Sequence, residues 1–404
     1  MYTKEHFIKK FGTWSSWDFN IDKMIHDPGF NLHWIPYDNF YDIEQIDDKD
    51  SIYFKYYASQ EAKLKNYMTD EQDYEVCDSE DCGKVTLKEL KDYKYNILTF
   101  IKVIKNIMNA GFYSSCTTRF LGISKNPSTQ NYIIVMEPCD TTVQDYLSNW
   151  SLDTLWTLKL DLLHEIIQGL NALHENNFVH CDLKGENISM KGIHELYPLD
   201  IFIDPVLYEL SDNKNNNVYG SIPYIPPEVL RGNEFTEEGD IYSFGGIMYE
   251  VATGNQPFVD QAYDTYLMID ICNGVRPKVP DMMLNLIPKC YLDLLYQCWD
   301  DDPSKRPTTR EVIDTIISWK ISNVIEEFID ADDNREKMSR SHEQKLYRSL
   351  SKFHPQYYCT SKYIYTLYEL QDSLEDIKSG KCADPNLYIY DDIYRRQNME
   401  TEQE

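Results

Sequence analysis

Residues 180–187, HCDLKGEN, constrain this chain more than any other segment. They come directly after residues 153–176, where leucine and isoleucine recur at helical spacing and predict a long amphipathic helix. Asp182 and Asn187 lie five residues apart on the loop after this helix, with Lys184 between them. The spacing suits one kind of chemistry, in which the Asp accepts a proton from a hydroxyl, the Lys neutralises a phosphate and the Asn binds a divalent metal ion. Alone, this pattern can occur in any loop after a helix.

Charge limits the partners of this chain. Its 404 residues include 39 Lys and Arg against 67 Asp and Glu, a formal net charge of −28. So acidic a surface repels phosphate backbones and anionic lipids, which argues against nucleic-acid and membrane-surface partners but allows a local basic pocket for one nucleotide. The N-terminus has no signal-peptide core, no run approaches the ~18 apolar residues of a membrane helix, and the ten cysteines lack zinc-ligand spacing. We expect an intracellular, cytoplasmic protein with no membrane insertion.

Hydrophobic periodicity separates a strand-rich part of the chain from a helical part, and it predicts an α+β fold with two lobes. The clearest patterns are a strand over 131–137 and helices over 153–176, 240–253, 291–299 and 309–319. The expected parts are a lead-in over 1–35, a small lobe over 36–138 with an acidic, solvated loop at 70–81, a large lobe over 139–320 and a charged, flexible tail over 321–404.

Four further motifs follow the octapeptide in order. They are YGSIPYIPPE at 219–228, DIYSFGG at 240–246, GVRP at 274–277 and CWDDDPSKRP at 298–307. Together with HCDLKGEN they resemble the protein kinase superfamily over about residues 36–320, and within it the tyrosine-kinase-like group, as in a large fungal expansion of kinase-like proteins. This resemblance implies the two-lobed protein kinase fold, with ATP and Mg²⁺ as cofactors and a protein as substrate or partner.

The resemblance implies roles for the catalytic loop. Asp182 would be the catalytic base and Lys184 would contact the transferred phosphate. Asn187 would bind the second metal ion. Ser221 matches the hydroxyl that bonds the catalytic Asp and Lys in Ser/Thr-type kinases.

Three other matching residues would be structural anchors of the large lobe. Glu228 would pair with Arg306, and Asp240 would hold the backbone of the catalytic loop. Because these roles are structural, the presence of the three residues argues for the fold and not for turnover.

In the small lobe, Lys88 resembles the strand lysine that contacts the α- and β-phosphates of ATP. Residues 136–139 resemble the hinge, with Met136 as the gatekeeper and with the Glu137 carbonyl and the Cys139 amide facing adenine. The alternative interpretations are an ordinary exposed lysine and a plain edge strand.

The phosphate-binding loop departs from the family pattern. Such loops use glycine so that backbone amides approach the phosphates closely, but no glycine occurs between Gly29 and Gly83. The matching stretch at 47–54 reads DDKDSIYF and would present three carboxylates to phosphate. Each lost charge-assisted hydrogen bond is worth about 1.5–3 kcal/mol, so the loss of two would weaken nucleotide binding about a hundredfold or more.

The small-lobe helix lacks the glutamate that fixes the strand lysine in the family. No Glu occurs between Glu89 and Glu137, and the expected position resembles Val103. Asp92 is too near Lys88 in sequence to lie on the facing turn of the helix. Without a partner, Lys88 would keep rotamer freedom worth up to about 2 kcal/mol, unless a carboxylate from elsewhere replaces the glutamate.

The metal-binding DFG segment is also altered. Asp200 lies at the usual separation of thirteen from Asn187 (200 − 187 = 13) and would ligate Mg²⁺, although Asp204 offers an alternative register. Neither register keeps the glycine. In addition, Cys181 replaces the arginine that normally binds activation-loop phosphate, so activation by that route is not expected.

These observations favour a degenerate kinase, or pseudokinase, with weak or absent ATP phosphoryl transfer that acts as a docking or allosteric module. The alternative is an active Ser/Thr-type protein kinase, because phosphoryl transfer depends mostly on positioning and charge stabilisation. A third interpretation makes the kinase fold a scaffold and gives the function to the tail.

Overall fold

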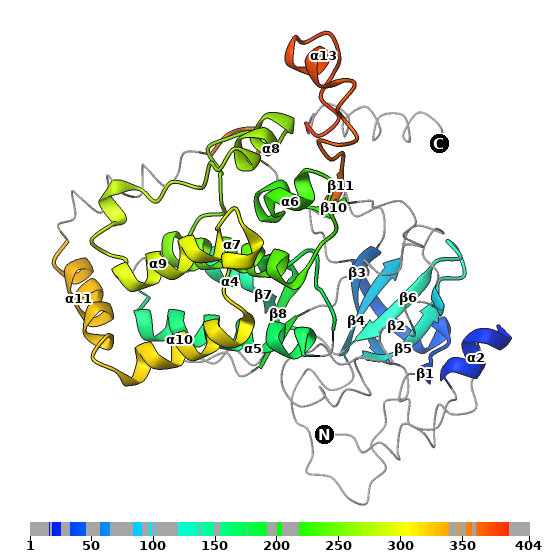
Figure 1. The fold of residues 1–404 in the computed structure, drawn as a ribbon. Coiled ribbons are helices and arrows are strands. Elements are labelled where there is room, and N and C mark those ends of the chain that lie inside the picture. The colour runs from blue at the N-terminus through cyan, green and yellow to red at the C-terminus, as the bar shows by residue number, and fades with distance from the viewer. Residues whose placement is uncertain are drawn as a thin grey trace, which may run out of the picture. The chain divides into compact units, whose positions relative to one another are not determined.

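The computed structural model describes most of the large lobe and parts of the rest of the chain (Figure 1). The described residues are 16, 18–25, 33–45, 57–64, 84–90, 97–98, 101, 120–136, 139–148, 154–175, 177–191, 200–203, 218–338, 346, 353–357 and 361–387. Two compact units divide the chain, one with residues 1–142 and 188–215 and the other with residues 143–187 and 216–404. The acidic stretch 70–81, the stretch 47–54, Val103, Glu137 and Asp204 lie outside the described residues.

The first unit contains a six-stranded sheet with the order β1-β5-β6-β4-β3-β2. Its strands are β1 (His33–Trp34), β2 (Phe40–Gln45), β3 (Tyr57–Leu64), β4 (Lys84–Leu90), β5 (Phe120–Lys125) and β6 (Tyr132–Met136). Strands β1 and β5 pair in parallel, and the other described pairs of this sheet are antiparallel. Helix α2 (Phe19–Ile25), the 3₁₀ turn η1 (Tyr37–Asn39) and a small sheet of β7 (Thr141–Thr142), β8 (Ile188–Lys191) and β9 (Asp200–Ile203) complete the described part of the unit.

Strand β6 is apolar on both faces, and each face packs into its own cluster. Ile134 and Met136 join a cluster with Ile21 and Ile25 of α2. The intervening side chains Ile133 and Val135 belong to a second cluster with Val85 and Leu87 of β4. Successive side chains of a strand point to opposite faces, so a continuous apolar run such as YIIVM fits a strand that is covered on both sides.

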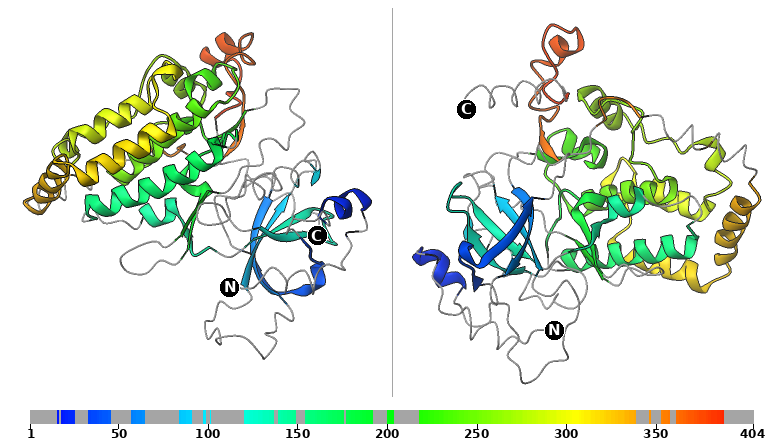
Figure 2. Two further views of the ribbon diagram at one scale, coloured as in Figure 1. Left: turned by 60° about the horizontal axis from the view of Figure 1, so that its bottom comes forward. Right: turned by 180° about the vertical axis from the view of Figure 1, so that it is seen from behind.

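The second unit is mostly helical. Its elements are α4 (Val143–Ser148), α5 (Trp156–His174), η3 (Gly185–Asn187), β10 (Val218–Gly220), η5 (Ile222–Tyr224), α6 (Pro227–Leu230), α7 (Glu237–Thr253), α8 (Thr265–Cys272), η6 (Asp281–Met283), α9 (Lys289–Cys298), η7 (Pro303–Lys305), α10 (Thr309–Ile321), α11 (Ile325–Glu336), β11 (Lys362–Ile364) and α13 (Leu374–Lys378). Figure 2 shows its long helices running side by side. The sheet unit and the helical unit together give the expected α+β protein kinase fold.

Helix α7 forms the centre of this unit, and nearly all of its side chains are buried. Glycine is required at Gly246, because a Cβ atom there would come within 2.7 Å of the ring of Tyr224. At Gly245 a Cβ atom would come within 2.8 Å of the ring of Trp299. The two glycines of the motif DIYSFGG therefore let aromatic rings pack directly on the backbone of α7.

The segment after residue 320 is folded over much of its length, in place of the flexible tail that its charge predicts. Phe328 of α11 is 1% exposed and lies in edge contact with Trp156, with ring centroids 5.6 Å apart. Its ring also lies 5.5 Å from that of Trp319. In addition, the carboxylate of Asp332 accepts a hydrogen bond from the Trp156 amide at the start of α5, at 3.3 Å. A few apolar and capping contacts thus order a segment whose composition is mostly polar.

Candidate active site

Asp240 organises the loop that carries HCDLKGEN. It lies in α7 with no solvent exposure, and its carboxylate accepts hydrogen bonds from the backbone amides of His180 (2.7 Å) and Cys181 (2.9 Å). The ring of His174 at the end of α5 lies 2.9 Å from the same carboxylate. Cys181 takes a left-handed conformation, with φ of 68°, while its amide donates to Asp240. Such a conformation is costly for a non-glycine residue and persists because the surrounding hydrogen bonds hold it.

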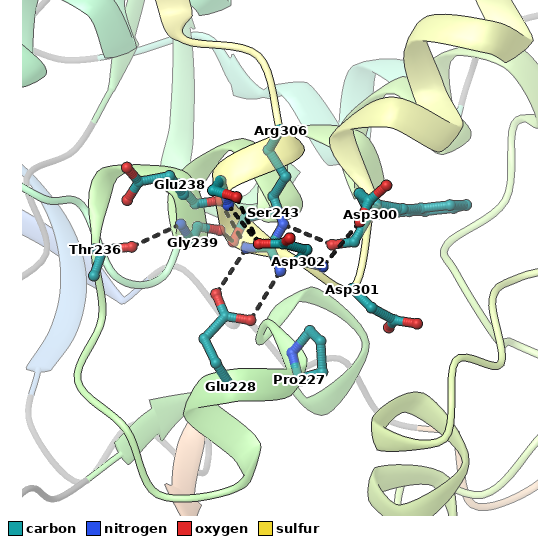
Figure 3. Close-up of polar contacts among 12 residues, drawn as sticks. Pro227, Glu228, Thr236, Glu238, Gly239, Ser243, Asp300, Asp301, Asp302 and Arg306 are labelled. Atoms are coloured by element: carbon teal, nitrogen blue, oxygen red, sulfur yellow. Dashed lines mark hydrogen bonds and ion pairs between the residues drawn. The ribbon is translucent and has the colours of Figure 1, made fainter.

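Arg306 joins three segments of the helical unit (Figure 3). Its two terminal nitrogens donate to the two carboxylate oxygens of Glu228, at 2.7 and 2.8 Å. It also donates to the carbonyl oxygens of Glu238 and Asp300, both at 2.9 Å. The guanidinium lies 5.2 Å from the ring centroid of Tyr242. This bidentate, buried pair holds α6, the start of α7 and the loop before α10 together.

Asp182 lies on the loop before η3 and is buried. The side-chain amide of Asn187 donates to its carbonyl oxygen at 2.7 Å and to its carboxylate at 2.9 Å. The hydroxyl of Ser361 donates a second hydrogen bond to the carboxylate. Burial raises the pKa of Asp182, whereas the charge of Lys184 and the hydrogen bonds from Ser361 and Asn187 act in the opposite direction. A carboxylate with a raised pKa is a better proton acceptor, as a general base requires.

Lys184 is fully buried, and its ammonium forms an ion pair with the carboxylate of Glu186 two residues later. Lys184 is also close enough to Asp182 to lower the pKa of that carboxyl. The positive charge that would meet a phosphate is therefore shared between two carboxylates.

Ser221 is buried and follows β10 directly. The preceding residue, Gly220, has a φ of 152°, and a Cβ atom there would lie 3.3 Å from the carboxylate of Asp182. The glycine therefore lets the backbone before Ser221 pass close to Asp182. The structure thus brings together Asp182, Lys184, Asn187 and Ser221 in one unit.

The other predicted site residues belong to the sheet unit. Lys88 lies in β4, paired with Ser59 and Ile134, and Asp200 is the first residue of β9, paired with Lys191. Their side chains are outside the described part of the structure. Met136 is 5% exposed at the end of β6, and Cys139 is half-buried. The nucleotide- and metal-binding roles of these residues stay predictions.

Sequence reasoning missed three members of this site. Glu186 lies inside the octapeptide, but no spacing rule pairs it with Lys184. Glu250 of α7 is buried, Tyr224 donates a hydrogen bond to it at 2.6 Å, and it lies close enough to Glu186 and Lys184 for their charges to act on its pKa. Ser361 is 179 residues from Asp182, and the local signal near it is no more than the aromatic run YIYTLYEL.

The family model of the protein kinase domain matches residues 63–316, more than half of the chain. This chain belongs to the protein kinase family. A putative serine/threonine-protein kinase/receptor of Acanthamoeba polyphaga mimivirus is 30% identical over 212 residues, which are 51% of this chain and 13% of the relative. Receptor-interacting serine/threonine-protein kinase 4 of Mus musculus is 29% identical over 196 residues, 45% of this chain and 25% of the relative.

Dual specificity protein kinase shkE of Dictyostelium discoideum is 38% identical over 154 residues, 36% of this chain and 20% of the relative. The chain therefore spans a quarter or less of the length of these kinases. Within the described residues, no helix has the length and apolar character needed to cross a membrane. The same residues hold no group of three or more His, Cys, Asp or Glu side chains arranged to bind a metal ion.

Proposed function

We propose that this kinase family member is a pseudokinase of the tyrosine-kinase-like group, with weak or absent transfer of the ATP γ-phosphate, that acts on a protein partner as a cytoplasmic docking or allosteric module. The observation that carries the proposal is a contrast between two sets of residues. The contacts of Asp240 and the Glu228–Arg306 pair, which build the frame, are present. The residue types that handle the nucleotide are altered.

The altered residues are visible in the sequence. No glycine lies between Gly29 and Gly83, and no glutamate lies between Glu89 and Glu137. Triphosphate would therefore lack amide donors at its β- and γ-phosphates, and Lys88 would lack its partner. The ion pair between Lys184 and Glu186 would weaken phosphate binding further. It reduces the positive electrostatic potential at Lys184, where the transferred phosphate would be bound.

A second candidate function is an active Ser/Thr-type protein kinase, which the geometry of the catalytic loop favours. Asn187 donates its amide hydrogens to Asp182, which leaves its carbonyl oxygen as the group able to bind a metal ion. Asn187 therefore fits the role of a Mg²⁺ ligand, and Asp200 would be the second. A bound Mg²⁺ would neutralise charge on the phosphates of ATP. Asp182 would accept the proton of the acceptor hydroxyl.

Nucleotide is expected to stabilise this chain very little. Millimolar ATP with Mg²⁺ is expected to raise the melting temperature of the full chain by less than about 1 °C, because a ligand stabilises a protein only in proportion to its occupancy. Thermal unfolding with and without nucleotide measures this shift. A saturable shift of several degrees, together with phosphate incorporation that is lost in Asp182→Asn, would instead favour the active kinase.

Glycine can be restored to the stretch 47–54 by substitution. Replacing Asp50 and Ile52 together with glycine is expected to tighten ATP binding about tenfold or more, because the change removes one carboxylate and lets backbone amides approach phosphate. Titration with a fluorescent ATP analogue measures the affinity. The matched control replaces both residues with alanine, which removes the same side chains but keeps a Cβ atom, and is expected to gain less. Equal ATP affinity in wild type, the glycine variant and the alanine variant would mean that the missing glycines are not the cause of weak nucleotide binding.

A further inference from the structure

The carboxylate of Asp182 accepts a hydrogen bond from a hydroxyl group of the same chain. Ser361 donates its hydroxyl hydrogen to this carboxylate and is 9% exposed. In a kinase reaction the acceptor hydroxyl makes the same contact, because the catalytic Asp must receive its proton. Ser361 therefore lies where the hydroxyl of a protein substrate would lie relative to Asp182.

The residues after Ser361 form a strand on the segment that precedes Ser221. Strand β11 pairs antiparallel with β10, with Gly220 opposite Lys362 and Val218 opposite Ile364 (Figure 1). The rings of Tyr219 and Tyr363 meet edge to face, with centroids 5.4 Å apart. Addition of a strand to an exposed edge is a recurring way to bind an extended peptide, with backbone hydrogen bonds supplying affinity and side-chain pockets supplying specificity.

Apolar and backbone contacts hold this segment in place along its length. Ile364 is fully buried, and the amide of Leu367 donates to the carbonyl oxygen of Leu230 in α6 at 2.9 Å. A Cβ atom on Gly232 would come within 2.8 Å of the Cβ atom of Tyr368, so this part of the Tyr368 side chain packs directly on the backbone of Gly232.

Polar contacts at the end of the segment fasten it to helix α8. Asp384 accepts hydrogen bonds from the amide (2.8 Å) and the hydroxyl (2.6 Å) of Thr265, the first residue of α8. The buried side chain of Asn386 donates to the carbonyl oxygen of Tyr365 (2.9 Å) and accepts from its amide (3.0 Å). Such satisfied, buried hydrogen bonds indicate a specific docking contact rather than a segment that crosses the surface by chance.

We propose that residues 361–387 bind in the peptide-binding site of this kinase domain as an intramolecular ligand. In this arrangement β11 fills the edge of β10, and Ser361 takes the position of the acceptor hydroxyl on Asp182. The inference rests on the site described under the proposed function, but it holds whether or not phosphate is transferred. A protein partner can reach Asp182 only after this segment leaves.

The contacts define the kind of peptide that would replace the segment. It would be extended, with a Ser or Thr at the position of Ser361 and an aliphatic residue three positions later, at the buried site of Ile364. The tethered segment has a large advantage over such a peptide, because the local concentration of a tethered ligand is typically in the millimolar range.

The test uses the full chain and a fluorescent synthetic peptide of residues 357–368. Two variants are designed to release the segment: Ile364→Asp places a charge at a fully buried position, and Ser361→Asp places a carboxylate against Asp182. Two matched controls are Tyr368→Asp, at a position with 68% exposure where the new side chain keeps the Cβ atom that packs on Gly232, and Ser361→Ala. Two measurements are made on each protein: amide hydrogen exchange in peptides that cover 218–220 and 362–364, and binding of the synthetic peptide.

Wild type and Tyr368→Asp are expected to exchange slowly and to bind the peptide at least about 100-fold more weakly than the released variants. In Ile364→Asp and Ser361→Asp, exchange in both strands is expected to accelerate at least about tenfold. Ser361→Ala is expected to stay close to wild type in exchange, because β11 keeps its backbone pairing. If Ile364→Asp does not fold, Ser361→Asp carries the test.

Unchanged exchange in both release variants would overturn the inference, as would released variants that do not bind the peptide. Neither readout requires phosphoryl transfer. A strong melting shift with Mg²⁺ and ATP would therefore reject the pseudokinase proposal without affecting this inference, and unchanged exchange would reject the inference alone.

Discussion

Replacing Arg306 with alanine is expected to lower the free energy of unfolding by about 3–5 kcal/mol, because the change leaves the carboxylate of Glu228 without its partner at a largely buried position. The guanidinium has no solvent exposure, and the Glu228 side chain is 12% exposed. The same change removes the donors to the carbonyl oxygens of Glu238 and Asp300. Urea unfolding followed by circular dichroism measures the difference.

Arg310 offers a matched control for this prediction. It lies in α10, is 70% exposed at its side chain and pairs with Asp314 at 3.6 Å. Arg310→Ala removes the same side chain from a solvated ion pair, and its expected cost is below about 0.5 kcal/mol. A loss of less than about 1 kcal/mol in Arg306→Ala would show that the buried pair does not hold the frame of the helical unit.

Glu250→Gln is expected to remove much of the pH dependence of stability between pH 5 and 8. Burial raises the pKa of Glu250 from 4.5 to about 8, the charge of Glu186 adds to the rise, and the hydrogen bond from Tyr224 opposes it. Glu250 therefore keeps its proton in the folded state at neutral pH, whereas an unfolded chain loses it above pH 4.5. The contribution to stability is full below pH 4.5 and is lost as the pH rises to about 8.

The size of this effect follows from the shift in pKa. A change from 4.5 to about 8 corresponds to a loss on the order of 4 kcal/mol across this range. Glutamine is neutral at every pH and can still accept the hydrogen bond from Tyr224, so the variant is expected to be more stable than wild type at pH 8. Urea unfolding at several pH values measures the slope. The matched control is Glu237→Gln, which changes an exposed carboxyl at the first turn of the same helix.

An unchanged slope in Glu250→Gln would mean that the carboxyl of Glu250 is ionised in the folded protein. The loss of stability at high pH would then have to come from other groups. In that case the burial of Glu250 beside Tyr224 would not control its proton.

Much of the fold could be predicted from local patterns. The apolar run at 131–137 corresponds to β6, and the leucine periodicity at 153–176 corresponds to α5. The patterns at 240–253 and 309–319 correspond to α7 and α10, with ends that differ by a few residues. Helical and strand periodicity depends only on which side chains must be buried, so a single sequence carries this information.

The contacts of the site were harder to predict, because they depend on residues far apart in sequence. Asp182 and Asn187 lie in one motif, and their roles could be inferred from spacing. The pairing of β11 with β10 joins segments more than 140 residues apart (362 − 220 = 142), and no local pattern identifies the edge that an aromatic run will join. The burial of Lys184 against Glu186 is also a tertiary effect, because both residues would be solvated on an isolated loop.

The ring of Phe328 has a practical consequence for truncated proteins. The family match ends at residue 316, but the aromatic surfaces of Trp156 and Trp319 are covered by a residue that lies beyond it. A shortened recombinant fragment that stops at residue 320 would present both indoles to water, and one that stops at residue 316 would also lose Trp319 and leave the indole of Trp156 uncovered. Either fragment would lose the cap that Asp332 gives to α5. Such fragments are expected to be less soluble than a chain that continues through residue 338, and low expression of a minimal fragment would reflect its cut end rather than a fault in the catalytic loop.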